Sequence, residues 1–193
     1  MDNYKKNLKL LTENHVYSED MEHDACGVGV IASTEGKKSR EIVEYGIEAL
    51  KAVWHRGAVD ADGKTGDGAG IHVEIPKDFF IEKIEVTGHD YDNSEICVGM
   101  IFLPRNDYSS QESCKTIVES ELTKNDFSIY GWRQVPVNPK ILGEKAFQTM
   151  PEIIQVLFKS NDPNLIDKNL ERKIYETRKK IENKAFELSL NNF

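Results

Sequence analysis

The 193-residue sequence predicts an α+β domain built around one hydrophobic core. Short apolar runs of strand length alternate with longer stretches whose apolar residues recur at helical spacing. The chain is 39% hydrophobic, which is enough for one core, and it is too short for two large domains.

The first half of the chain is predicted to hold a polar leader, two strands and two helices. The leader has weak periodicity, whereas the stretch before His55 carries apolar residues on one helical face. Pro76 suits the first turn of a helix because its φ is already fixed. In order, the predicted elements are a leader at 1–25, a strand at 26–33, a helix at 39–55, a loop with tight turns at 57–70, a strand at 69–75 and a short helix through Phe80.

The second half is predicted to add three strands and two amphipathic helices. The apolar run before Pro104 indicates the clearest central strand. Near the end, apolar residues from Leu170 to Leu188 face one side of a long helix, with charged residues opposite. The predicted elements are strands at 95–103, 127–135 and 151–159, helices at 111–123 and 167–188, and an extended loop with Pro136, Pro139 and Gly143 before the third strand.

Composition excludes several classes of partner. A net charge of −8 and a pI near 5.2 argue against nucleic-acid or membrane-surface binding. No apolar run of about 20 residues is present, and the charged N-terminus does not fit a secretory signal. Three cysteines, an odd number, favour a reducing compartment, so we expect a cytoplasmic protein.

Three local patterns do not support a cofactor or metal site. Gly27-x-Gly29-x-x-Ala32 lies inside an apolar run instead of after a strand, so it is not a dinucleotide fingerprint. The run Gly63-Lys64-Thr65 resembles the end of a phosphate loop, but aspartates beside it would repel phosphate, and a turn is the better interpretation. The polar stretch at 22–26 lacks paired metal-ligand spacing.

Cys26 is the candidate nucleophile. Cys97 lies within a predicted strand and Cys114 on the apolar face of a predicted helix, so both are interpreted as core residues. Cys26 instead opens a glycine-spaced apolar run directly after the polar leader. If the mature chain begins there, Cys26 gains a free α-amine. A thiol pKa of ~8.5 and an α-amine pKa of ~7.7–8.0 are close enough for proton exchange near neutral pH.

Ordered motifs extend this interpretation along the chain. They cover nearly everything after Ala25 and closely resemble the glutamine amidotransferase domain of the glutamate synthase large subunit, a class II amidotransferase. The motifs are Cys26 to Ala32, Trp54-His55-Arg56-Gly57-Ala58, Thr65 to Ile71, Gly131 to Asn138, Leu142 to Ala146, Met150-Pro151, Leu170 to Tyr175 and Arg178 to Glu182.

The resemblance implies an N-terminal-nucleophile hydrolase fold, an αββα sandwich of which this chain holds the first part. It also implies a propeptide at 1–25 and a partial type-2 amidotransferase domain at 26–193. Cys26 would attack the side-chain amide of L-glutamine, and Arg56 would help hold the site. A structural ion pair at a helix end is the alternative role of Arg56. His55 is expected to be structural, and Gly27 and Gly29 to admit a neighbouring backbone.

The resemblance also implies cofactors and partners outside this segment. The complete enzyme would use FMN and an iron–sulfur cluster to aminate 2-oxoglutarate with the ammonia released here. Its partners would be the rest of the large subunit and a small subunit.

The chain matches only the first part of the family's domain. Family members continue with an Asn-Gly pair that forms the oxyanion hole and with residues that bind the ends of glutamine, and no counterpart is found here. Because one lost oxyanion donor typically lowers the rate ~10²–10³-fold, we expect negligible glutaminase activity from this polypeptide alone. The alternative function is a non-catalytic half-domain that serves binding or assembly.

Overall fold

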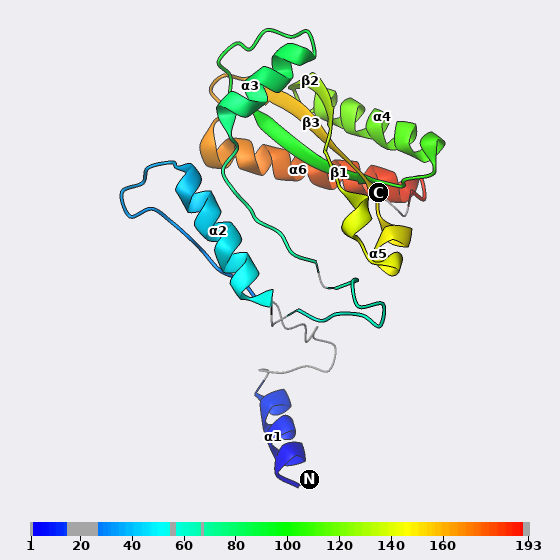
Figure 1. Ribbon diagram of the computed structural model, residues 1–193. Coiled ribbons are helices and arrows are strands. Elements are labelled where there is room, and N and C mark those ends of the chain that lie inside the picture. The colour runs from blue at the N-terminus through cyan, green and yellow to red at the C-terminus, as the bar shows by residue number, and fades with distance from the viewer. Residues whose placement is uncertain (1, 15–26, 55–56, 67, 191–193) are drawn as a thin grey trace. The chain divides into compact units, whose positions relative to one another are not determined.

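The computed structural model describes residues 2–14, 27–54, 57–66 and 68–190 (Figure 1). The chain divides into two compact units. The first comprises Met1–Ala58 and Asp67–Ile71, and the second comprises Val59–Gly66 and His72–Phe193. Helices and an antiparallel sheet together confirm the predicted α+β class.

The second unit is organised by a three-stranded antiparallel sheet of strands β1 (Cys97–Leu103), β2 (Phe127–Gln134) and β3 (Glu152–Ser160). All three strands lie where the sequence predicted them. The prediction that β1 is central was wrong, because the strand order is β1-β3-β2. The burial pattern gives the reason: residues 154–158 of β3 are buried without a break, as expected of a strand covered on both faces.

Helices α4 (Tyr108–Lys124) and α6 (Asp167–Glu187) cover one face of the sheet (Figure 1). Both helices were predicted, and α4 begins three residues earlier than expected. Asp107 is its N-cap, and the Asp107 carboxylate accepts a hydrogen bond from the Ser110 amide at 3.0 Å. The core on this face is formed by Cys97, Ile117, Val118, Leu122, Phe127, Val156, Phe158, Leu170, Ile181 and Ala185.

Helix α3 (Lys77–Val86) packs on the opposite face. It starts after Pro76 as predicted, but it continues past Phe80 because Ile84, one turn further, is also buried in the core. The loop after α3 is fastened to the sheet through Asp92. Its carboxylate accepts a hydrogen bond from the Tyr130 hydroxyl at 3.0 Å and forms a short ion pair with Lys159.

The chain between β2 and β3 was predicted as an extended loop. It holds two short helices instead, the 3-10 helix η2 (Pro139–Ile141) and α5 (Glu144–Thr149). Each helix starts where the sequence provides a suitable residue: Pro139 opens η2, and Gly143 is the N-cap of α5.

The first unit contains helices α1 (Asp2–Glu13) and α2 (Arg40–Ala52). Helix α2 was predicted, and Ser39 caps it through a hydrogen bond from the Ile42 amide at 3.4 Å. Helix α1 lies in the leader, for which no element was predicted. Lysine, leucine and glutamate favour helices, and Lys9 and Glu13 form an exposed i,i+4 pair at 3.7 Å.

Two predicted strands are not observed. The described part of the first, Gly27 to Ser33, and the second, Ala69 to Ile75, are in neither helix nor strand. Val28 is 91% exposed and Val30 is 86% exposed. A strand requires a hydrogen-bonded neighbour, and no described residue pairs with either segment. The described residues therefore form one sheet, and the second sheet of the sandwich is not among them.

Candidate active site

The two predicted catalytic residues, Cys26 and Arg56, lie outside the described residues, as do His55 and Asp67. The residues next to them in the chain are described. Gly27, Trp54, Gly57 and Gly68 belong to the first unit, and Gly66 belongs to the second.

Gly27, which directly follows Cys26, lies beside the end of α2. A methyl group on Gly27 would be 3.8 Å from Cγ2 of Val53, the C-cap residue of that helix. Three residues after Val53 comes Arg56 in the sequence. Gly57 then donates a hydrogen bond from its amide to the Trp54 carbonyl at 3.1 Å. The residue after Cys26 therefore lies beside the C-cap of α2, three residues before Arg56 in the sequence.

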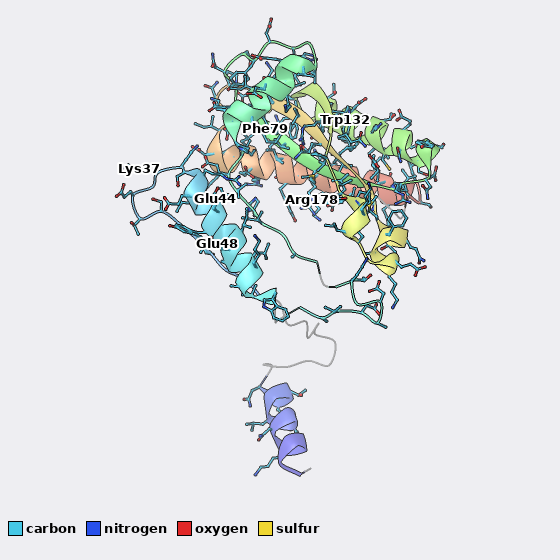
Figure 2. The ribbon with its side chains drawn as sticks, viewed as in Figure 1. Lys37, Glu44, Glu48, Phe79, Trp132 and Arg178 are labelled. Carbon is cyan, nitrogen blue, oxygen red and sulfur yellow. The ribbon has the colours of Figure 1, made fainter. Side chains whose placement is uncertain are left out.

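The end of the motif from Thr65 to Ile71 also contacts α2. A methyl group on Gly46 would be only 2.9 Å from Cδ1 of Ile71, so the glycine permits this close approach. On its polar surface α2 carries Glu44 and Glu48 one turn apart, both exposed (Figure 2). Helix α2 thus connects the segments after Cys26, before Arg56 and after Asp67.

The expected role of Gly27 and Gly29 is not observed. Within the described part of the chain, a methyl group on Gly27 would have only the side chain of Val53 within 4 Å, and a methyl group on Gly29 would have no atom within that distance. Among the described residues no strand pairs with this segment, so the expectation that both glycines admit a neighbouring backbone stays a prediction.

The aspartate-rich loop is a tight hairpin in the second unit, as its turn interpretation predicted. Val59 and Gly66 form an isolated antiparallel bridge, and the Gly63 amide bonds to the Asp60 carbonyl at 2.9 Å. The carboxylate of Asp62 accepts hydrogen bonds from the amides of Lys64 and Thr65 at 2.9 and 2.7 Å. A phosphate loop would offer such amides to phosphate, so Asp62 occupies the place of the anion.

Sequence reasoning missed the connection between this hairpin and α5. Lys145 pairs with Asp60 at 2.6 Å, and Gly143 lies against Asp62 and Thr65. The available signal was Gly143 itself, a glycine directly before a helix-forming run.

The other two cysteines are core residues, as predicted. Burial, with smaller contributions from Glu95 and Glu171, raises the pKa of the Cys97 thiol to about 12. Burial also raises the pKa of the Cys114 thiol, assisted by Asp107. Both thiols are therefore protonated at neutral pH and covered by the core, which makes them poor nucleophiles.

Residues 2–14, 27–54, 57–66 and 68–190 contain neither a metal site nor a membrane span. Within these ranges no group of three or more His, Cys, Asp or Glu side chains is arranged to hold a metal ion. Nor does any helix there have the length and apolar character needed to cross a bilayer.

Comparison with known proteins identifies the class. The sequence profile described as "Glutamine amidotransferases class-II" matches residues 26–192, which is most of the chain. The chain therefore belongs to the class-II glutamine amidotransferase family. The match begins at Cys26, the residue singled out as nucleophile.

Similar curated proteins are glutamate synthases. The chain is 50% identical over 190 residues to the glutamate synthase [NADPH] large chain of Azospirillum brasilense, covering 98% of this chain and 12% of that protein. It is 40% identical over 169 residues to the chloroplastic ferredoxin-dependent glutamate synthase 2 of Arabidopsis thaliana, covering 86% and 10%. The chain thus spans about a tenth of the length of these relatives.

Proposed function

We propose that this chain is the glutamine-hydrolysing segment of a glutamate synthase, with Cys26 as the nucleophile. The observation that carries the proposal is the contrast among the three cysteines. Cys97 and Cys114 are buried thiols with raised pKa values, whereas Cys26 opens the region that matches the amidotransferase family.

The chemistry requires a free amine on Cys26. While Ala25 remains attached, the nitrogen of Cys26 is an amide and cannot act as a base. Removal of residues 1–25 would convert it to an α-amine that takes the thiol proton. The thiolate then attacks the side-chain carbonyl of glutamine, the C–N bond breaks, and the protonated amine supplies the proton with which ammonia leaves.

The second half of the reaction regenerates the enzyme. Water attacks the resulting thioester, the C–S bond breaks, and glutamate departs while the amine accepts a proton from the water and returns it to sulfur. Arg56 is proposed to hold the geometry around the nucleophile. Its position three residues beyond Val53 supports this role, because Val53 lies beside the residue that follows Cys26.

The released ammonia would aminate 2-oxoglutarate in the remainder of a larger enzyme. This chain and a small subunit would assemble with that remainder in the cytoplasm. FMN and an iron–sulfur cluster would belong to that remainder. A cluster needs several thiolates held together. The described cysteines, one in β1 and one in α4, are separately buried and protonated, so they do not fit a cluster.

Glutamine hydrolysis and intact mass test the proposal together. Release of ¹⁵N-ammonia from amide-labelled glutamine is measured for the chain and for any longer gene product in which its reading frame continues. We expect the active form to begin at Cys26 and Cys26→Ser to lower the rate by roughly 10⁶-fold, the scale seen when a protease nucleophile is removed. Cys114→Ala, assayed on the folded fraction, is the control and should retain activity. A Cys26→Ser protein that hydrolyses glutamine at the unchanged rate would exclude Cys26 as the nucleophile.

A further inference from the structure

Gly143 is a glycine for reasons of space. Its backbone angles, φ −71° and ψ 165°, are ordinary values that any residue can adopt. A methyl group there would lie 2.5 Å from the backbone nitrogen of Thr65 and even closer to the side chains of Asp62 and Thr65. Only a residue without a side chain allows the hairpin at 59–66 to approach α5 this closely.

Asp62 organises the hairpin at this contact. Besides the two amides, its carboxylate accepts a hydrogen bond from the Thr65 hydroxyl at 2.5 Å. The Thr65 hydroxyl, followed by the amides of Lys64 and Thr65, holds the pKa of Asp62 well below its usual range, and the amide of Glu144 in α5 lowers this pKa further. Asp62 thus interacts both with its own hairpin and with the first turn of α5.

A second connection lies beside the first. Lys145 on α5 forms an ion pair with Asp60 at 2.6 Å, and the Asp60 amide donates to the Thr65 carbonyl at 2.7 Å. Helix α5 is in turn fixed to the chain that follows β1. There the Arg105 guanidinium stacks on the Phe147 ring at 4.4 Å and donates to the Phe147 carbonyl at 3.5 Å. The hairpin is therefore fixed to the sheet of the second unit through α5.

We propose that Asp62, Thr65, Gly143 and Lys145 form a hairpin lock that holds the hairpin at 59–66 against α5 and that supports glutamine hydrolysis. In the sequence the hairpin lies between the motif that contains Arg56 and the one that contains Asp67, which is the reason to expect an effect on hydrolysis. These four are positioning residues, and the inference rests on the proposed function for its catalytic consequence. The lock itself is independent of catalysis and is testable without it.

Limited trypsin digestion measures the lock directly. Lys64 lies inside the hairpin and is the only lysine or arginine between residues 57 and 76. Cleavage after Lys64, followed by mass spectrometry, therefore reports opening of the hairpin. Cleavage after Lys37 and Lys38, which are exposed in the first unit, is the internal reference.

We expect Gly143→Ala and Asp62→Ala each to speed cleavage after Lys64 roughly tenfold relative to the reference, because the open hairpin becomes more populated. Lys145→Ala should have a smaller effect, since it removes one exposed ion pair. Lys140→Ala, an exposed lysine one helix earlier, is the matched control and should behave as the unaltered chain. Unchanged cleavage in both Gly143→Ala and Asp62→Ala would overturn the lock.

The effect of the lock on catalysis is measured as kcat/KM in the form of the protein that hydrolyses glutamine. Asp62→Ala should lower kcat/KM for glutamine about tenfold at an unchanged unfolding temperature, in proportion to its cleavage effect. Asp62→Asn should retain most of the resistance to cleavage and most of kcat/KM, because its amide oxygen still accepts hydrogen bonds from Lys64 and Thr65. Faster cleavage with unchanged kcat/KM would overturn the positioning role. If no form of the protein hydrolyses glutamine, the proposed function fails while the trypsin result still decides the lock.

Discussion

The sheet of the second unit and the segment after Cys26 have similar apolar patterns but opposite burial. Leu157 in β3 is fully buried, whereas Val30 is 86% exposed. The difference lies in their neighbours: β3 is paired on both sides, and no described strand pairs with residues 27–33. An apolar run indicates a tendency to form a strand, but the strand appears only where the chain supplies hydrogen-bonding partners.

The helices that cover the sheet and helix α2 also differ in burial. Apart from Ile96 and Gly143, the described buried residues belong to α3, α4, α6 and the sheet, whereas α2 has no buried residue. The described helix next in the chain to the motifs of Cys26 and Arg56 is thus less buried than the helices that cover the sheet. Active-site segments are commonly drawn from the less stable parts of a protein.

The largest difference between the two regions is expected when one apolar residue in each is truncated. Leu157→Ala removes a side chain packed among Phe80, Ile84 and Tyr130, so it should lower the free energy of unfolding by about 2–5 kcal/mol. Val30→Ala should change it by less than about 0.5 kcal/mol, because Val30 is exposed. Urea unfolding followed by circular dichroism measures both. Equal losses would show that the two regions share one core.

A smaller difference is expected from adding a methyl group to a glycine in each region. A methyl group on Gly99 of β1 would be 2.8 Å from Cγ1 of Val156, which is buried and cannot move away freely. Gly99→Ala should therefore lower the free energy of unfolding by about 1–3 kcal/mol. The methyl position of Gly29 has no described atom within 4 Å, so Gly29→Ala should have little effect in the same urea experiment. A larger loss for Gly29→Ala would indicate that its segment is packed in solution.

The parts of the fold that the sequence predicted are those with local signals. Strands β1, β2 and β3 and helices α4 and α6 are long enough for periodicity to identify them. The order of the strands was not predictable, because pairing depends on contacts between distant residues. The segments at 27–33 and 69–75 show the same limit, since their composition favours strands while partners decide the outcome.

The candidate site likewise has parts with a local sequence signal and parts without one. The sequence predicted Cys26 as the nucleophile from its place between a polar leader and an apolar run, and this stays a prediction. The core roles of Cys97 and Cys114 were predicted from their neighbours and are confirmed. The hairpin lock was not found, because Lys145 and Asp60 are 85 residues apart. Gly143 gave no indication of its partner, since its backbone angles need no glycine. Only the three-dimensional contact explains why a side chain is excluded there.

The smallest effect is expected at the Asp92 anchor of the second unit, the contacts of Asp92 with Tyr130 and Lys159. The described residues of the first unit have no counterpart of this anchor. The hydrogen bond from Lys159, then those from Ser94 and Tyr130, hold the pKa of Asp92 below its usual range. A lowered pKa means that the ionised carboxylate stabilises the fold above the pKa of the unfolded chain, near 3.9, and that this contribution disappears as the pH falls toward the folded value. Because Asp92 is partly exposed, Asp92→Asn should lower the free energy of unfolding by only about 0.2–1 kcal/mol at pH 7.

Urea unfolding at several pH values tests the Asp92 anchor. The difference between the unaltered chain and Asp92→Asn should be constant from pH 7 to pH 5 and shrink below pH 4, because only the unaltered chain carries this carboxylate. Asp162→Asn is the matched control: Asp162 follows the end of β3, forms no ion pair in the described structure, and should show a smaller difference at pH 7. A difference for Asp92→Asn that persists unchanged to pH 2 would show that its charge does not stabilise this unit, and that the packing of α3 against the sheet alone holds the loop in place.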